Sequence, residues 1–274
     1  MLRRRTLLLS IPALALSGAI ARAQAWPTRF VRLIVPYPAG GGADAIARIL
    51  GQRLTEMWGQ QVVIENKGGA GGNIAHDTAA HAPPDGYTML FSPSSFPIMP
   101  MLYTALNYDP TDLVPISLLG KYPNLIVVPN ASTTKTLKEF IDNAKANAGK
   151  VTFATPGIGT TPHLTAELFK TMAKLDITHV PYRGVAAGAM SDLIANRIDS
   201  MFNTTGSLLQ AVRSGQVRGL AQSTPERSPL APELPTFAEA GVPGFNVSSW
   251  YGLFVPPKRR VKSWRRCMTA SQRC

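Results

Sequence analysis

The chain has 274 residues, with 28 Lys and Arg against 16 Asp and Glu, and a formal net charge of +12. This excess of positive charge lies at the two ends of the chain. Residues 1–23 hold four Arg, residues 257–274 hold seven basic residues, and neither segment contains an acidic residue. The body between them therefore has 17 basic and 16 acidic residues. A nucleic-acid-binding domain carries its basic side chains on the folded surface, so we expect no nucleic-acid partner. The two cysteines, Cys267 and Cys274, lie in the tail, which excludes a disulfide framework in the body.

Residues 1–23 have the pattern of an export signal. A basic stretch at 1–5 precedes an apolar stretch at 6–20, and small residues frame two cleavage sites, 23/24 and 25/26. The apolar stretch is short for a membrane-spanning helix of about 20 residues. We therefore predict a periplasmic protein. The sequence leaves the exact site open, and also the route, which is Sec or, from the RRTLL run, twin-arginine.

Strands and helices are predicted to alternate along the body. The strands are expected at 30–35, 62–65, 87–91, 125–128, 151–154, 177–180, 200–202 and 217–221, and helices at 44–58, 137–146 and 162–172. This alternation predicts an α/β fold with mainly parallel sheets flanked by helices. The Pro-rich stretch 224–235 is expected to be an exposed connection at which the chain returns from one lobe to the other.

The first helix is predicted from its apolar periodicity. Its apolar face is expected to contain Ile46, Ile49, Leu50, Leu54 and Met57, which recur at 3.6-residue spacing. A strand, a glycine-rich loop and an amphipathic helix occur at 30–58, and the same succession is repeated at 151–173.

The two glycine-rich loops are the candidate binding elements. The first, PYPAGGGAD at 36–44, lets the backbone turn sharply and opens a helix whose free N–H groups and dipole attract anions. Asp44 is expected to cap this helix. In the second loop, TPGIGTTPH at 155–163, backbone N–H groups and the hydroxyls of Thr160 and Thr161 are expected to hold a second polar end of a ligand. The alternative, that both loops are only turns, stays open.

Motifs for catalysis, metals and nucleotides are missing from the sequence. There is no H-E-x-x-H, G-x-S-x-G or Walker A pattern, and Pro162 stands where a dinucleotide-binding loop needs its third glycine. His163 is expected to pack or cap rather than to act as a base. We therefore predict no enzyme, no cofactor and no metal site, although an α/β enzyme acting on an anionic substrate remains an alternative.

Several long motifs resemble one known family. VRLIVPYPAGGGADAIARIL, ENKGGAGGNIA, PDGYTMLF, FATPGIGTTPHLTAELF, HVPYRG and LPTFAEAGVPGFNVSSWYGLFVP are similar to the Bug family, the solute receptors of tripartite tricarboxylate transporters. The resemblance runs from about residue 26 to 256. It implies a two-lobed, type II-like periplasmic binding protein, with lobe 1 formed by 26–105 plus 222–256 and lobe 2 by 106–221.

The resemblance also implies what is bound, and where. The ligand would be a small carboxylate (a di- or tricarboxylate, an acidic amino acid or an aromatic acid), delivered by a monomer to membrane permease subunits. The implied ligand-binding residues are Tyr37, Ala39, Gly40, Gly41, Asp44, Ser92, Ser94, Gly157, Gly159, Thr160, His163, Tyr182, Arg183 and Asn203. Arg183 is either a counter-charge for the ligand or part of a salt bridge, and Asn203 stands where many relatives carry Asp.

The tail at 257–274 departs from the family pattern. It is basic, has no amphipathic period and holds both cysteines. We expect it to replace the family's last helices, which would leave a truncated relative that folds or binds poorly. A natural tail that binds anionic lipid is the alternative.

Overall fold

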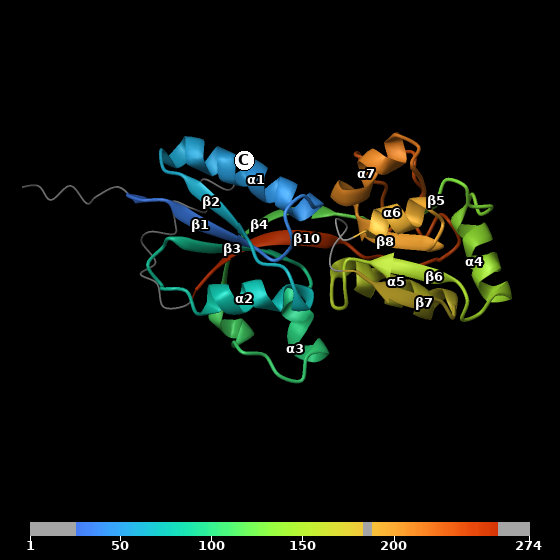
Figure 1. Cartoon of the computed structure of the whole chain (residues 1–274), viewed down its shortest axis with the longest axis horizontal. Helices are drawn as coiled ribbons and strands as arrows, with labels where there is room; N and C mark the ends of the chain where they lie inside the picture. The colour runs from blue at the N-terminus through green and yellow to red at the C-terminus, as the bar shows by residue number, and fades with distance from the viewer. Residues whose placement is uncertain (1–25, 183–187, 257–274) are drawn as a thin grey trace, which may run out of the picture.

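The computed structural model describes residues 26–182 and 188–256, and Figure 1 gives the arrangement. The predicted export signal, Arg183 and the basic tail lie outside the described residues. Two five-stranded sheets lie side by side, each with helices on both faces. The predicted two-lobed α/β architecture is therefore confirmed.

The first sheet combines the N-terminal strands with the last strand of the body. Its order is β2 (Val62–Asn66), β1 (Val31–Val35), β3 (Thr88–Pro93), β10 (Ser249–Val255) and β4 (Val114–Tyr122). Strand β1 pairs parallel with β2 and β3, whereas β10 pairs antiparallel with β3 and β4. The sheet is therefore mixed rather than mainly parallel.

The second sheet has the same plan. Its order is β7 (Thr178–Pro181), β6 (Thr152–Thr155), β8 (Ser200–Thr204), β5 (Asn124–Pro129) and β9 (Val217–Gln222). Strand β6 pairs parallel with β7 and β8, and β5 pairs antiparallel with β8 and β9. The antiparallel pairs are made by β10 in the first sheet and by β5 in the second, and the chain enters each of these strands from the other lobe. An antiparallel strand reached in this way needs no helical crossover.

Helices cover both faces of each sheet. In the first lobe, α1 (Gly42–Trp58) lies on one face and α2 (Asn73–Ala80) on the other, with the short α3 (Met99–Leu102) and 3-10 turns at Ala70–Gly72, Phe96–Ile98 and Pro110–Asp112 nearby. In the second lobe, α4 (Leu137–Ala146) and α5 (Thr161–Ala173) pack in one core, and α6 (Ala189–Ile194) and α7 (Thr205–Arg213) in the other. No helix in the described part of the chain is long and apolar enough to span a bilayer.

Helix α1 buries a face of small residues. Ala43, Ala47, Leu50 and Leu54 face the sheet, while Ile49 is 66% exposed. Ile46 and Met57 of the predicted apolar face are also exposed, at 37% and 43%. Hydrophobicity alone ranks isoleucine above alanine, but the alanines let the helix pack close to β1 and β2. The prediction placed the helix correctly and the apolar face only in part.

The chain crosses between the sheets in two places. It passes directly from β4 to β5 through Pro123, and it returns between Val247 and Ser249. Before returning, it stays with the second lobe, because Phe237 N–H donates to Gln222 O (3.0 Å) and Val247 N–H to Ser223 O (2.8 Å). The chain therefore passes from the first lobe to the second at Pro123 and returns between Val247 and Ser249. The predicted lobe boundaries were 105/106 and 221/222. Residues 224–235 lie along the second lobe and do not join the two.

One buried asparagine ties the two crossings together. Asn124 Nδ2 donates to Ser249 Oγ (2.9 Å) and to Thr165 Oγ1 (2.7 Å), and Asn124 N–H donates to Ser223 Oγ (2.9 Å). Asn124 and Ser249 are fully buried. Three segments far apart in sequence, around Thr165, Ser223 and Ser249, thus meet at a single residue where the lobes join.

Candidate functional site

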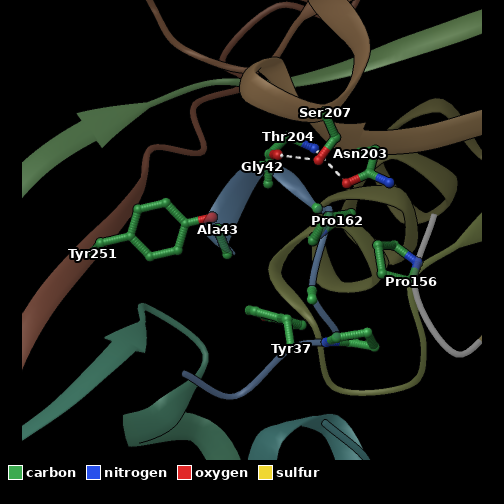
Figure 2. Close-up of a pocket in the computed structure, with 12 residues that line it drawn as sticks. Tyr37, Gly42, Ala43, Pro156, Pro162, Asn203, Thr204, Ser207 and Tyr251 are labelled. Carbon is green, nitrogen blue, oxygen red and sulfur yellow. Dashed lines mark hydrogen bonds between the residues drawn. The ribbon is translucent and has the colours of Figure 1, made fainter. Parts of the chain in front are cut away.

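Three helices direct their N-termini at one pocket between the lobes. Helix α1 comes from the first lobe, and α5 and α7 come from the second. The cavity that they line is narrow, about 50 Å³, which is below the usual range for small-ligand sites. The lining of this interlobe pocket, drawn in Figure 2, consists of Tyr37, Pro38, Ala39, Gly41, Gly42, Ala43, Pro156, Pro162, Asn203, Thr204, Ser207 and Tyr251.

The helix starts differ in the backbone donors that they offer, because the pocket residue of α5, Pro162, has no N–H and Thr205 N–H of α7 donates to Pro123 O (3.2 Å). The first helical hydrogen bonds run from Ala45 N–H to Gly41 O (3.0 Å) and from Leu164 N–H to Thr160 O (3.0 Å), so the N–H groups before them are not used in the helix. None of the three helices has a side-chain cap in the structure described. Each helix start carries roughly half a positive charge. The pocket is therefore electropositive through its backbone.

No charged side chain of the described residues lines the interlobe pocket. A backbone site of this kind binds an anion by N–H donation in a partly enclosed space, where such bonds are strengthened by the low dielectric constant. A cationic side chain is not needed for this chemistry.

Asp44 holds the first loop in place. Its Oδ2 accepts from Gly40 N–H (3.0 Å) and Arg48 Nε (2.9 Å), and its Oδ1 accepts from Asn66 Nδ2 (3.0 Å). Asn66 Nδ2 also donates to Tyr37 O (3.0 Å). Burial alone would raise the pKa of Asp44, but these hydrogen bonds and the Arg48 charge together lower it. The carboxylate is thus saturated by the loop and by α1, and it does not cap the helix as predicted.

The second loop is held by neutral groups. Thr160 Oγ1 donates to Gly157 O (2.7 Å), Gly157 N–H donates to Thr155 Oγ1 (3.2 Å) and Gly159 N–H donates to His163 Nδ1 (3.3 Å). The donors that the sequence assigned to a ligand at Gly157, Gly159 and Thr160 are therefore used within the loop. Of this loop, Pro156 and Pro162 reach the interlobe pocket.

Two histidines stand behind the second loop. The rings of His163 and His179 are 4.5 Å apart, and His179 Nε2 is 2.7 Å from Thr155 Oγ1. Burial, and then the neighbouring His163, lower the pKa of His179 to about 4. Burial also lowers the pKa of His163, against the opposing effect of Glu167. Both rings are therefore neutral near pH 7, and the neutral Nδ1 of His163 can accept from Gly159.

A wider cleft adjoins the interlobe pocket. Tyr37, Pro38, Ala39 and Pro156 line both. The other residues of this adjoining cleft are Pro36, Asn66, Gly68, Gly69, Ala70, Gly71, Gly72, Ile74, Gly157, Ile158, Thr160, Tyr103, Pro181 and Tyr182. The hydroxyl of Tyr182 donates to Asp192 Oδ2 (2.7 Å), so it is already used. A ligand larger than the interlobe pocket can extend into this cleft.

Ser92 and Ser94 line neither space. Ser92 Oγ is fully buried and lies 2.9 Å from His76 Nε2, in a polar cluster with Tyr108 and Asn73 beneath α2. Burial lowers the pKa of His76 to about 3. Ser94 joins β3 to β10, because its N–H donates to Trp250 O (2.9 Å). Gly40, Gly159 and His163 likewise support loops without lining the interlobe pocket or the adjoining cleft.

Asn203 reaches the pocket from the end of β8. It is 3% exposed, and its Oδ1 accepts from Thr204 N–H (2.8 Å). Its Nδ2 donates to no group within the described part of the chain, and Asn203 lines the pocket (Figure 2). The amide thus presents a donor to a bound molecule.

The contribution of α7 is absent from the sequence prediction. Gly42 of α1 packs so close to this helix that a Cβ at Gly42 would lie 2.9 Å from Gly206 C and from Ser207 Oγ. Ser207 Oγ is 3.0 Å from Thr204 Oγ1. The run TTGS at 204–207 does carry a signal, since it combines capping residues with a glycine after a strand.

Two tyrosines, Tyr37 and Tyr251, line the pocket, and a third, Tyr122, packs against Tyr251. The Tyr122 and Tyr251 rings are 4.5 Å apart, and Tyr251 reaches the pocket beside Ala43 (Figure 2). Burial raises the pKa of Tyr251 to about 12. For Tyr37 and Tyr122, burial and the nearby Tyr251 hydroxyl together raise the pKa well above the usual range of a tyrosine. The phenols stay protonated and add no negative charge beside the helix N-termini.

The family is established by comparison with known proteins. Residues 46–274 match the family described as "Tripartite tricarboxylate transporter family receptor" (TctC), and the chain belongs to this family of solute receptors. It is 40% identical over 258 residues to a UPF0065 protein from the tcbD-tcbE intergenic region of Pseudomonas sp. strain P51, covering 92% of this chain and 76% of that one. It is 36% identical over 246 residues to protein BugT of Bordetella pertussis, covering 87% of this chain and 74% of that one.

Solved structures agree with this assignment. The periplasmic binding protein BugD superposes with a TM-score of 0.84 at 34% identity, covering 90% of this chain and 83% of that one. R. palustris Rpa4515 with adipate gives 0.84 at 33% identity, with the same coverage of 90% and 83%. MatC from Rhodopseudomonas palustris with bound malate gives 0.81 at 30% identity, covering 90% and 85%. The fold is therefore that of the periplasmic binding proteins.

Proposed function

We propose that this receptor captures a small carboxylate in the interlobe pocket. The observation that carries the proposal is the convergence of the N-termini of α1, α5 and α7 on one pocket that no charged side chain of the described residues lines. All three helix starts favour an anion through their dipoles, and α1 adds N–H groups that are not used within the helix, whereas the pocket residue of α5, Pro162, has none. Rpa4515 with adipate and MatC with bound malate, both relatives of this chain, support a carboxylate as the ligand.

The ligand-contacting groups in this proposal come from both lobes. The backbone donors of Gly41, Gly42 and Ala43 face the carboxylate from the first lobe, and Asn203 Nδ2 and the start of α7 face it from the second. Tyr37 and Tyr251 enclose it, and Tyr182 lies along the extension into the adjoining cleft. Binding would thus hold the two lobes together.

The receptor would release its ligand to the membrane permease subunits of a tripartite tricarboxylate transporter. The family of the chain supports this partner. Export by residues 1–23 and action as a monomer in the periplasm belong to the same proposal. A receptor binds without turnover, so the ligand leaves unchanged.

A thermal-shift screen against a panel of carboxylic acids tests the proposal. We expect at least one acid to raise the melting temperature in proportion to the logarithm of its concentration, since a ligand that binds only the folded state stabilises it. NMR spectra of that acid after long incubation with the protein should be unchanged. Stabilisation only by uncharged compounds, or consumption of the acid, would contradict the proposal.

A further inference from the structure

The sizes of the two spaces bear on which carboxylate can bind. The interlobe pocket has a volume of about 50 Å³, and roughly 10 to 15 Å³ of such space holds one water molecule. The pocket therefore accommodates a carboxylate group but not the rest of a ligand. The adjoining cleft has a volume of about 870 Å³, which is in the usual range for small-ligand sites. A bound carboxylate thus has room for its body in this cleft.

Two half-exposed isoleucines line the adjoining cleft, one from each lobe. Ile74, on α2 of the first lobe, is 49% exposed, and Ile158, in the second loop, is 56% exposed. Exposed apolar groups that gather in a groove are typical of a ligand-binding surface, because their burial is favourable. From this we infer that the ligand is a carboxylate with a hydrocarbon body, either a ring or an unbranched methylene chain. The inference rests on the proposed function and narrows it by setting hydroxylated acids aside.

A glycine-rich run at 68–72 brings the two isoleucines to the same wall of the cleft. A Cβ at Gly69 would lie 2.8 Å from Ile74 Cδ1, and a Cβ at Gly71 would lie 2.9 Å from Ile158 O. The run itself carries no side chain larger than a methyl group, so a ligand can approach its backbone closely. The isoleucines therefore flank one short stretch of backbone, where a flat or extended hydrocarbon can contact both.

Much of the remaining lining consists of ring faces. Hydrocarbon rings of proline and tyrosine come from both lobes, and they are supplied by Pro36, Pro38, Pro156, Pro181, Tyr103 and Tyr182. Apolar area that a ligand covers is removed from water, and the gain grows with that area. A hydrocarbon body is therefore matched by the walls around it as well as by the two isoleucines.

Three polar side chains of the cleft are already engaged within the protein. Both hydrogens of Asn66 Nδ2 are donated to protein acceptors at 3.0 Å. The Thr160 hydroxyl donates to Gly157 O (2.7 Å). The Tyr182 hydroxyl donates to Asp192 Oδ2 (2.7 Å). A hydroxylated ligand would lose water here without gaining these donors in return, which costs affinity.

The experiment uses acid pairs that differ only in the hydroxyl groups of the body. Adipate and galactarate share one carbon chain, and cyclohexanecarboxylate and quinate share one ring. Each acid is titrated into the full chain by calorimetry. In each pair that binds, we expect the hydrocarbon member to bind about tenfold or more tightly than its hydroxylated partner, because unmatched polar groups are rejected. Equal or tighter binding of the hydroxylated member overturns the inference and leaves the proposed function standing.

Substitution of the isoleucines tests whether they cause the preference. Ile74→Ser and Ile158→Ser should each weaken the hydrocarbon acid by about tenfold and the hydroxylated acid less, since apolar contact area is lost. Ile194→Ser is the control, because this residue of α6 is 47% exposed and lines neither space. It should leave the ratio of the two affinities unchanged. All three variants should melt like the parent, and an unchanged ratio in both Ile74→Ser and Ile158→Ser overturns the inference.

The screening panel separates this inference from the proposed function. A panel acid that binds while neither pair does supports the inference if its body is hydrocarbon and overturns it otherwise. If no carboxylate of the pairs or of the panel binds, the proposed function fails and the inference fails with it.

Discussion

The two loops that begin α1 and α5 reach the same result by different chemistry. Each joins a strand to a helix, and each leaves the start of that helix open to the pocket. The first loop is held by an ionised carboxylate, Asp44, which three donors surround. The second is held by neutral acceptors, among them Thr155 and His163. The open helix start is thus the feature that the two loops share, whereas the groups that hold each loop differ.

The largest effect is expected at Asp44. Asp44→Ala removes the common acceptor of Gly40 N–H, Arg48 and Asn66 from a site that is 3% exposed. We expect the free energy of unfolding to fall by about 2 to 3 kcal/mol and carboxylate binding to be lost. Urea denaturation and calorimetry measure the two effects. Asp142→Ala, which breaks the exposed pair with Lys138, should cost less than about 0.5 kcal/mol. Similar losses in both variants would refute the role of Asp44.

The contact between α1 and α7 is expected to give the next largest effect. At Gly42 a Cβ would lie 2.9 Å from the backbone of Gly206, so Gly42→Ala should push the two lobes apart at the pocket. We expect affinity for the bound acid to fall by about tenfold, since both helix starts must face one ligand. Gly120→Ala, where a Cβ would meet nothing within 4 Å, is the control. Unchanged affinity in Gly42→Ala would show that the lobes need not approach so closely.

Mild acid should distinguish the two loops. The pKa of His179 is lowered to about 4, so its folded form binds fewer protons than the unfolded chain, whose histidines titrate near 6.5. Stability therefore falls as the pH drops from about 6.5 to 4, by about 1 kcal/mol for this half-buried ring. The Lys170 charge acts in the same direction and Glu167 opposes it. Asp44, whose pKa is lowered below the usual carboxyl range, stays ionised at pH 5.

The measurement is urea unfolding at pH 7 and pH 5 in the parent chain and in His179→Gln. The variant should lose part of the difference between the two pH values. The buried His76, with its pKa lowered to about 3, and His163, whose pKa burial also lowers, should maintain the remainder. An identical pH dependence in parent and variant would mean that His179 does not support the second loop.

The smallest effect is expected within the second loop. Thr160→Val removes the hydroxyl that donates to Gly157 O (2.7 Å) at a residue that is 1% exposed. We expect a loss of about 1 kcal/mol, the usual value for one neutral hydrogen bond. Thr171→Val, which removes a similar bond to Glu167 O (2.9 Å) at an exposed position, should cost less. A cost at Thr160 equal to that at Asp44 would remove the contrast between the loops.

Much of the fold could be predicted from local sequence. The glycine-rich loops were found because glycine and proline between a strand and a helix are a local signal. Strands β4 and β10 were missed, since β4 is an edge strand with many exposed residues and β10 follows a long irregular stretch. Whether a strand pairs parallel or antiparallel depends on its partner, which single-sequence periodicity does not contain.

The site was predictable only in part for the same reason. Tyr37, Ala39, Gly41 and Asn203 do line the interlobe pocket. The use of Asp44 by Arg48 and Asn66, and of Ser92 by His76, depends on which donors the fold brings within reach. Helix α7 enters the pocket through its packing against Gly42, which involves residues more than 160 positions apart. The role of these residues in binding stays a prediction.

The buried amide of Asn124 has a mechanical consequence. Asn124 stands on the first pass of the chain and its side chain donates to Ser249 on the second, so this bond holds the two passes against each other. A rotation of one lobe against the other would then be expected to pivot near this residue, which also donates to Thr165 of α5 (2.7 Å). A small rotation there sweeps the far rim of the opening through a much larger arc. The receptor would therefore open and shut like jaws, with its deepest part changing least.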